Sequence, residues 1–239
     1  MARAVIITSY LEYPLDIPAL LSPDDRIVCL DGGYDIACAQ GIQPHLWLGD
    51  FDSLQGTLPE SENGPGSLME IRSYPPEKDY TDLELAFRAL DPEETPNLLV
   101  IGGLGGRLDQ TLVNIQMLQR YTAVPGAEAG APKFRSIEML DGHNRCFAVH
   151  GYKDAPGPES HWIHKIPPES GAFLSLLPLT EKCTGVTLRN ARYPLENADL
   201  RRGASLSVSN EFTDAPAELM VRHGCLLVII ARGNRADRL

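Results

Sequence analysis

Short apolar runs that end in glycine or aspartate recur through the first 120 residues, and segments with helical periodicity separate them. Apolar runs this short are typical of strands that are buried on both faces. The expected strands are Ala4–Thr8, Ile27–Leu30, His45–Leu48, Leu68–Ser73 and Asn97–Ile101. Because strands that alternate with helices form βαβ units, the pattern predicts an α/β domain with a mostly parallel sheet.

Helix signals support this alternation. Thr81-Asp82-Leu83-Glu84 reads as a capping box, and the apolar residues that follow it repeat with helical spacing. A longer helix is expected from about Arg107 to Tyr121, and a short one over Tyr34–Gln40. These segments supply the helices that an open parallel sheet needs on its faces.

Helical periodicity disappears near Phe134, and short strand patterns with turn signals replace it. The stretch Gly151–Ser170 is rich in proline and glycine and is typical of a linker or a long loop. We therefore expect an α/β domain over residues 1–152 and an all-β domain over residues 153–239. Ser136–Leu140 and Arg145–Val149 are expected strands at the end of the first domain. The expected strands of the all-β domain include Ala172–Leu177, Gly185–Arg189, Ala204–Ser209, Ala217–Val221 and Leu226–Ala231.

Composition excludes several classes of protein. Hydrophobic residues make up 43% of the chain, enough for a buried core, and the net charge of −11 argues against a general nucleic-acid or membrane-surface binder. No apolar stretch approaches the roughly 20 residues that span a bilayer. Five cysteines without a CxxC spacing argue against a disulfide framework, so we expect a cytoplasmic protein.

Three polar motifs follow three of the expected strands. Asp31-Gly32-Gly33, Gly49-Asp50 and Gly102-Gly103 each come directly after an apolar run. One aspartate–glycine pair after a strand is usually only a turn. Ligands of open parallel sheets bind in the crevice outside the carboxyl ends of the strands, so the three motifs together predict one shared site.

Carboxylates dominate this predicted site. Asp50 and Asp52 are two residues apart and project to the same side of an extended segment, where they repel each other unless a cation lies between them. Mg²⁺ is usually held by one or two carboxylates together with substrate phosphates, although a solvated Asx-turn explains the same pair. Asp82 falls in the first turn of a helix, and Lys78 beside these acids suits a phosphate.

The run Gly102-Gly103-Leu104-Gly105-Gly106 before a helix indicates a phosphate site of bare backbone amides. Arg107 opposes the dipole at the start of that helix, and an anionic ligand would remove the conflict. The run is neither a P-loop nor a dinucleotide fingerprint. Asp109 either holds Arg107 or accepts a hydrogen bond from a nucleotide.

Taken together, these motifs resemble those of the thiamine pyrophosphokinase family. The shared features are Asp31-Gly-Gly, Gly49-Asp-Phe-Asp-Ser53, Lys78-Asp-x-Thr-Asp82 and Gly105-Gly-Arg-x-Asp109, and in the C-terminal part Gly185-Val-Thr-Leu188, Arg192-Tyr-Pro-Leu195, Asn197, Leu200, Gly203 and Ser207-x-Ser-Asn210. Gln110 stands where many bacterial members have histidine. Arg189-Asn-Ala191 departs from the usual stretch before the aromatic residue.

The resemblance implies a homodimer whose active site forms between subunits, with an N-terminal α/β domain that binds Mg–ATP and a C-terminal β-sandwich that binds thiamine. Such an enzyme transfers the β,γ-diphosphate of ATP to the thiamine hydroxyl and releases AMP. The implied metal ligands are Asp50, Asp52 and Asp82, which with Asp79 form the catalytic set. The implied nucleotide-binding residues are Asp31, Gly32, Gly33, Lys78, Thr81, Gly105, Gly106, Arg107, Asp109 and Gln110, and the thiamine-binding residues are Tyr193, Ser207, Ser209 and Asn210.

Some alternatives stay open at this stage. Either Asp79 or Asp109 accepts the hydroxyl proton or orients donors. A phosphatase that uses Asp50-x-Asp52 as nucleophile and acid is a second enzyme class, although it leaves the Gly-Gly-Arg helix start unexplained. A non-catalytic module that binds a nucleotide or a vitamin is a third interpretation.

Overall fold

The computed structural model describes residues 3–51, 69–125, 133–153 and 162–233. The chain divides into two compact units, which we describe separately. The first contains residues 1–117 and 134–142, and the second contains residues 118–133 and 143–239. The strand Asn144–His150, which precedes the predicted boundary near residue 152, thus belongs to the second unit.

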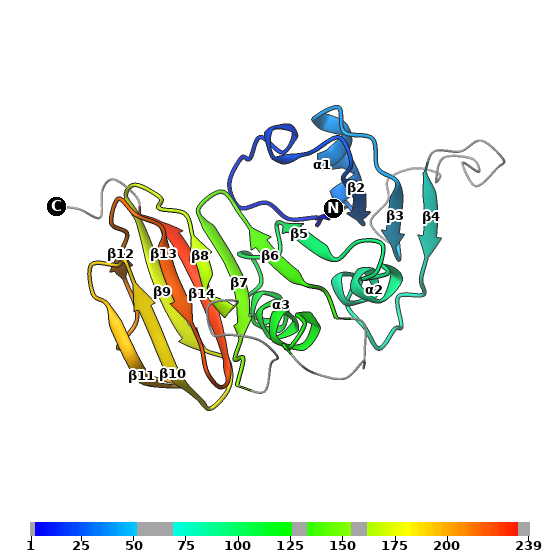
Figure 1. Cartoon of the computed structure of the whole chain (residues 1–239). Helices are drawn as coiled ribbons and strands as arrows, with labels where there is room; N and C mark the ends of the chain where they lie inside the picture. The colour runs from blue at the N-terminus through cyan, green and yellow to red at the C-terminus, as the bar shows by residue number, and fades with distance from the viewer. Residues whose placement is uncertain (1–2, 52–68, 126–132, 154–161, 234–239) are drawn as a thin grey trace. The chain divides into compact units, whose positions relative to one another are not determined.

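The first unit is built on a parallel sheet in the order β6-β5-β1-β2-β3-β4, of which Figure 1 labels every strand except β1. Each neighbouring pair of its strands runs parallel, as the sequence predicted. The chain moves outward from β1 through β4 and then returns to the other side of β1. The strands are β1 (Arg3–Ile7), β2 (Arg26–Leu30), β3 (Leu46–Gly49), β4 (Glu70–Ser73), β5 (Asn97–Ile101) and β6 (Ser136–Leu140).

Helices connect these strands. They are α1 (Gly33–Ala39), α2 (Asp82–Ala89) and α3 (Leu108–Tyr121), together with the 3₁₀ helix η1 (Pro18–Leu20). Thr81 is the N-cap of α2, and its hydroxyl accepts a hydrogen bond from Glu84 N at 3.2 Å, which confirms the predicted helix start. The connection from β2 to β3 and the connection from β4 back to β5 run in opposite directions across the sheet, so the right-handed crossover rule assigns α1 and α2 to opposite faces.

Close packing fixes the turn that leads into α1. A Cβ atom on Gly33 would overlap the carbonyl oxygen of Ile7 in β1, so only glycine lets α1 approach the sheet this closely. Ala37 of α1 packs into a buried cluster with alternate residues of the strands, including Val5, Ile7 and Cys29. The Asp-Gly-Gly motif therefore has a packing function in addition to any role in binding.

The second unit is a β-sandwich, which confirms the predicted all-β domain. One antiparallel sheet has the order β12-β9-β14-β7 and the other β11-β10-β13-β8. Apolar side chains from both sheets form one buried cluster. The strands are β7 (Asn144–His150), β8 (His164–Ile166), β9 (Ala172–Pro178), β10 (Lys182–Arg189), β11 (Leu195–Arg201), β12 (Asn210–Glu211), β13 (Ala217–Met220) and β14 (Cys225–Arg232).

Three sequence expectations for this unit were wrong. Gly151–Ser170 was expected to be a linker or long loop, but His164–Ile166 within it forms β8 and pairs with β13. Ala204–Ser209 is not a strand, because a local turn bond from Val208 N to Ser205 O replaces strand pairing and leaves Leu206 and Val208 exposed. The strand β11 was not predicted from the sequence. Its residues are mostly polar, and it pairs only with β10 because it lies at the edge of a sheet. Edge strands that expose one side to solvent lack the apolar alternation that marks a strand.

None of the helices within the described ranges is both long and apolar enough to cross a membrane.

Candidate active site

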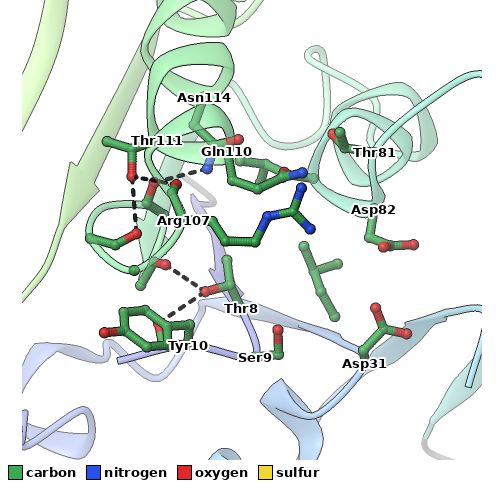
Figure 2. Close-up of a pocket in the computed structure, with 16 residues that line it drawn as sticks. Thr8, Ser9, Tyr10, Asp31, Thr81, Asp82, Arg107, Gln110, Thr111 and Asn114 are labelled. Carbon is green, nitrogen blue, oxygen red and sulfur yellow. Dashed lines mark hydrogen bonds between the residues drawn. The ribbon is translucent and has the colours of Figure 1, made fainter. Parts of the chain in front are cut away.

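A cavity of about 600 Å³ lies at the carboxyl ends of β1, β2 and β5 in the first unit. The strand order reverses between β1 and β5, and ligands of open α/β sheets bind at such a switch point. The volume falls within the range of small-molecule sites, roughly 300–1,000 Å³. In Figure 2, Asp31 and Asp82 lie on one side of this cavity, while Gln110 and Thr111 come from α3 on the other.

Three carboxylates and one lysine form a compact cluster beside the cavity. Lys78 Nζ lies 2.6 Å from Asp82 Oδ1 and 3.3 Å from Asp50 Oδ2, and its side chain is only 12% exposed. Asp31 accepts a hydrogen bond from Asp50 N at 3.2 Å. The structure therefore brings together Asp31, Asp50, Lys78 and Asp82, which the sequence had predicted from separate motifs.

The close spacing of these charges shifts the pKa values of the cluster. Burial, followed by the neighbouring Asp82 and Asp50 carboxylates, raises the pKa of Asp31 to about 6. Burial alone would lower the pKa of Lys78, but hydrogen bonds to Asp82 and Asp50 raise it overall. The cluster thus favours a cation between its carboxylates. Among the described residues, no three His, Cys, Asp or Glu side chains are already arranged around a metal position.

The glycine run after β5 forms the next wall of the cavity. Gly102, Gly105 and Gly106 have positive φ angles of 84°, 85° and 62°, and a Cβ atom on Gly105 would overlap the Glu12 carboxylate. Three of the loop's carbonyl oxygens accept side-chain hydrogen bonds: Thr8 Oγ1 to Gly102 O at 2.8 Å, Asn114 Nδ2 to Gly103 O at 2.8 Å, and Thr111 Oγ1 to Gly105 O at 3.0 Å. These bonds reduce the negative potential that the loop would present to an anion.

Arg107 lines the cavity just before α3 begins. Its side chain is 73% exposed, and its guanidinium makes a two-pronged ion pair with Asp109, with Nη2 at 2.6 Å from Oδ2 and Nε at 3.1 Å from Oδ1. The hydrogen bond from Arg107 lowers the pKa of Asp109. Of the two roles predicted for Asp109, the structure contains the contact with Arg107.

The predicted catalytic and nucleotide-binding residues divide into those that line the cavity and those that do not. Lys78 and Asp109 are in the second group, paired with Asp82 and Arg107 respectively. Those that line the cavity are Asp31, Thr81, Asp82, Gly105, Gly106, Arg107 and Gln110. Gly32 is the N-cap of α1, Gly33 is buried against β1, and Asp79 is exposed on the loop before α2. Asp52 and Ser53 lie outside the described residues.

The cavity also contains residues that the sequence analysis did not single out. Thr8, Ser9 and Tyr10 follow β1, and Asn114 lies on the face of α3 that carries Gln110. The rule that ligands gather at the carboxyl ends of strands points to residues 8–10 as well, because they directly follow the first apolar run. Their side chains carry no charge, so no motif drew attention to them.

The four residues predicted to bind thiamine belong to the second unit. Tyr193 is exposed, and its backbone is hydrogen-bonded to the buried amide of Asn210. Ser209 N donates a hydrogen bond to Ser175 Oγ at 2.9 Å, and Ser209 has a φ of 60°. Ser207 is buried, and its hydroxyl donates to Leu176 O at 2.6 Å. The fold therefore brings Tyr193 and Asn210 together, while the Ser207 hydroxyl is engaged in the sandwich.

Comparison with known proteins decides the family. Residues 17–126 match the family profile described as "Thiamin pyrophosphokinase, catalytic domain", and residues 161–226 match "Thiamin pyrophosphokinase, vitamin B1 binding domain". The chain is 32% identical to thiamine pyrophosphokinase of Bacillus subtilis over 202 aligned residues, and this alignment covers 84% of each of the two chains. This chain belongs to the thiamine pyrophosphokinase family.

Solved structures of thiamine pyrophosphokinases share its fold. The crystal structure of the Bacillus subtilis enzyme has a TM-score of 0.76 at 24% identity, covering 98% of this chain and 100% of that one. The protein from Geobacillus thermodenitrificans has a TM-score of 0.74 at 24% identity, covering 98% and 99%. Membership confirms the resemblance found in the motifs and favours a thiamine diphosphokinase over the phosphatase and the non-catalytic module.

Proposed function

We propose that this thiamine diphosphokinase binds Mg–ATP in the cavity of its first unit and thiamine against Tyr193 of its second unit. The observation that carries the nucleotide site is the arrangement at the switch point of the sheet. Asp31 and Asp82 line the cavity together with the glycine run and Arg107, and Lys78 pairs with Asp82 and Asp50 beside it. This combination of charges suits a metal–polyphosphate complex, whose cation and anion need opposite partners.

The donor set fits Mg²⁺. Carboxylate oxygens are the ligands that Mg²⁺ prefers, and Lys78 already places one positive charge between Asp50 and Asp82. We infer that Asp50, Asp52 and Asp82 bind the ion and that Asp31 supports this cluster. When bound, Mg²⁺ would neutralise charge on the phosphate oxygens.

The remaining groups position the phosphates. In the proposed reaction the thiamine hydroxyl oxygen bonds to the β-phosphorus, the bond from that phosphorus to the α,β-bridging oxygen breaks, and AMP leaves with that oxygen. Arg107 and the backbone amides of the glycine run would hold the transferred diphosphate, and Lys78 would add positive charge. Asp79 and Asp109 remain the two candidates for orienting donors or accepting the hydroxyl proton.

The thiamine site rests on Tyr193, whose exposed ring is available for stacking on the pyrimidine. Ser209 and Asn210 come from the neighbouring segment, and Ser207 is the fourth predicted member. We further propose that the protein is a cytoplasmic homodimer whose active sites form between subunits. The dimer is what the motif resemblance implies, and the composition of the chain supports the compartment.

Metal-dependent turnover tests the nucleotide site. Incubation with ATP, thiamine and Mg²⁺ should produce AMP, and EDTA should stop the reaction. Asp52→Asn and Asp82→Asn should each abolish turnover, while circular dichroism shows a native fold. A variant at Asp52 that retains the wild-type rate would remove this residue from the proposed metal ligands.

A further inference from the structure

The side-chain amide of Asn210 holds the backbone of Tyr193 from both sides. Asn210 is only 6% exposed. Its Oδ1 accepts a hydrogen bond from Tyr193 N at 3.0 Å, and its Nδ2 donates to Tyr193 O at 2.7 Å. The same Oδ1 also accepts from Glu211 N at 2.9 Å, so the amide joins two segments that are 17 residues apart.

Further contacts reinforce this junction. Arg192 N donates to Glu211 O at 3.0 Å, and Arg192 Nη1 lies 2.9 Å and 2.8 Å from the two carboxylate oxygens of Glu211. An isolated antiparallel bridge joins Ala191 to Phe212. The backbone around Tyr193 is thus fixed to β12 and its neighbours although Tyr193 belongs to no strand.

The ring that this junction presents is not part of the core. Tyr193 is 57% exposed, and the Arg192 guanidinium lies 5.6 Å from its ring centroid. The Asn210 amide fixes the backbone that carries this exposed ring, in addition to joining the two segments. Fixing the ring before a ligand arrives lowers the ordering cost of binding.

We infer that Asn210 is a positioning residue, which fixes Tyr193 as a stacking platform for thiamine and acts on the substrate only through that ring. The inference rests on the proposed thiamine site. It also refines the sequence prediction of Asn210 as a thiamine ligand, because the amide oxygen already accepts two backbone N–H groups and the amide nitrogen already donates to a third backbone group.

A double-mutant cycle on the full-length protein tests the inference. Thiamine affinity is measured by calorimetry for Asn210→Ala, Tyr193→Ala and the double variant. We expect each single change to weaken binding by about tenfold, and the double variant to bind within about twofold of Tyr193→Ala, because residues that act through one contact are not additive. Additive losses would mean that Asn210 contacts thiamine directly and would overturn the inference, as would wild-type affinity in Asn210→Ala.

Matched variants separate positioning from general damage. Asn210→Asp keeps the acceptor for Tyr193 N but loses the donor to Tyr193 O, so its affinity should lie between wild type and Asn210→Ala. Asn190→Gly removes another amide-to-carbonyl bond, from Asn190 Nδ2 to Pro216 O at 3.0 Å, and should leave thiamine affinity unchanged. Glycine also suits the φ of 56° at this position.

Two further measurements keep the outcomes distinct. ATP affinity should remain at the wild-type value in every variant, and if Asn210→Ala does not fold, Asn210→Asp completes the same cycle. A wild-type protein that binds no thiamine would contradict the proposed function and the inference together. Thiamine binding with an additive cycle would contradict the inference alone.

Discussion

Arg107 is the residue on which the proposed phosphate site depends most. Its guanidinium is held by Asp109 and yet remains largely exposed at the cavity, where a ligand can reach it. An exposed ion pair of this kind adds little to stability, because solvent screens the two charges. The geometry of the pair therefore serves to orient the guanidinium more than to stabilise the fold.

Replacing Arg107 by alanine should separate catalysis from stability. We expect kcat/KM for ATP to fall by about 10²–10³-fold, the range for removal of one strong transition-state donor. The melting temperature should stay close to wild type, because the side chain is exposed. Arg88→Ala is the control, since Arg88 pairs with Glu84 on α2 at 3.3 Å and does not line the cavity. Equal losses of activity in both variants would contradict this role.

Thr122 presents the opposite case, a polar residue whose hydroxyl is unsatisfied. It is 4% exposed, and among the described residues its Oγ1 has no hydrogen-bond partner. Because a buried unpaired hydroxyl costs free energy, Thr122→Val should raise the free energy of unfolding by about 1 kcal/mol. Calorimetry should show a melting temperature a few degrees higher, and a lower one would indicate a partner for the hydroxyl.

At the level of elements, one contact between β7 and α3 should depend on pH. His150 Nε2 lies 3.0 Å from Gln119 O, and burial lowers the pKa of His150 below its ordinary value of 6.5. His150 therefore binds a proton more readily in the unfolded chain than in the folded protein. Stability from this group is therefore present above about pH 6.5 and is lost as pH falls toward the lowered pKa.

The variant His150→Gln should reduce this dependence. Its melting temperature should fall less than that of wild type between about pH 8 and about pH 5, because glutamine does not titrate in this window. Thermal denaturation across the pH series measures the effect. Parallel curves for the two proteins would contradict the contribution of His150.

The elements also show what the sequence could predict. Buried strands such as β1 and β5 were predictable because each is a short apolar run, and the site followed from the polar motifs at their ends. The bridge from Lys78 to Asp50 and Asp82 was not, since it depends on the path of the loop before α2. The Asn210–Tyr193 contact depends on a turn with Ser209 at a φ of 60°, and no local pattern signals it.

On the scale of the whole molecule, the proposed dimer makes a prediction about mixed subunits. Asp82→Asn damages the nucleotide site, and Tyr193→Ala damages the thiamine site. If each active site takes these residues from different subunits, co-expression of the two variants restores one intact site in every mixed dimer. Random pairing would then give about a quarter of the wild-type activity.

Separately purified variants provide the baseline for this experiment. Light scattering on the co-expressed sample should show a dimer mass. Activity no higher than the average of the two separate variants would contradict an active site built from different subunits.

The central claim concerns which phosphorus is attacked, and the products of a single reaction test it. Phosphorus NMR or chromatography of a mixture of protein, Mg–ATP and thiamine should show AMP and thiamine diphosphate in equal amounts, because the β,γ-diphosphate moves as one unit. ADP with thiamine monophosphate, or inorganic phosphate without thiamine diphosphate, would contradict the account.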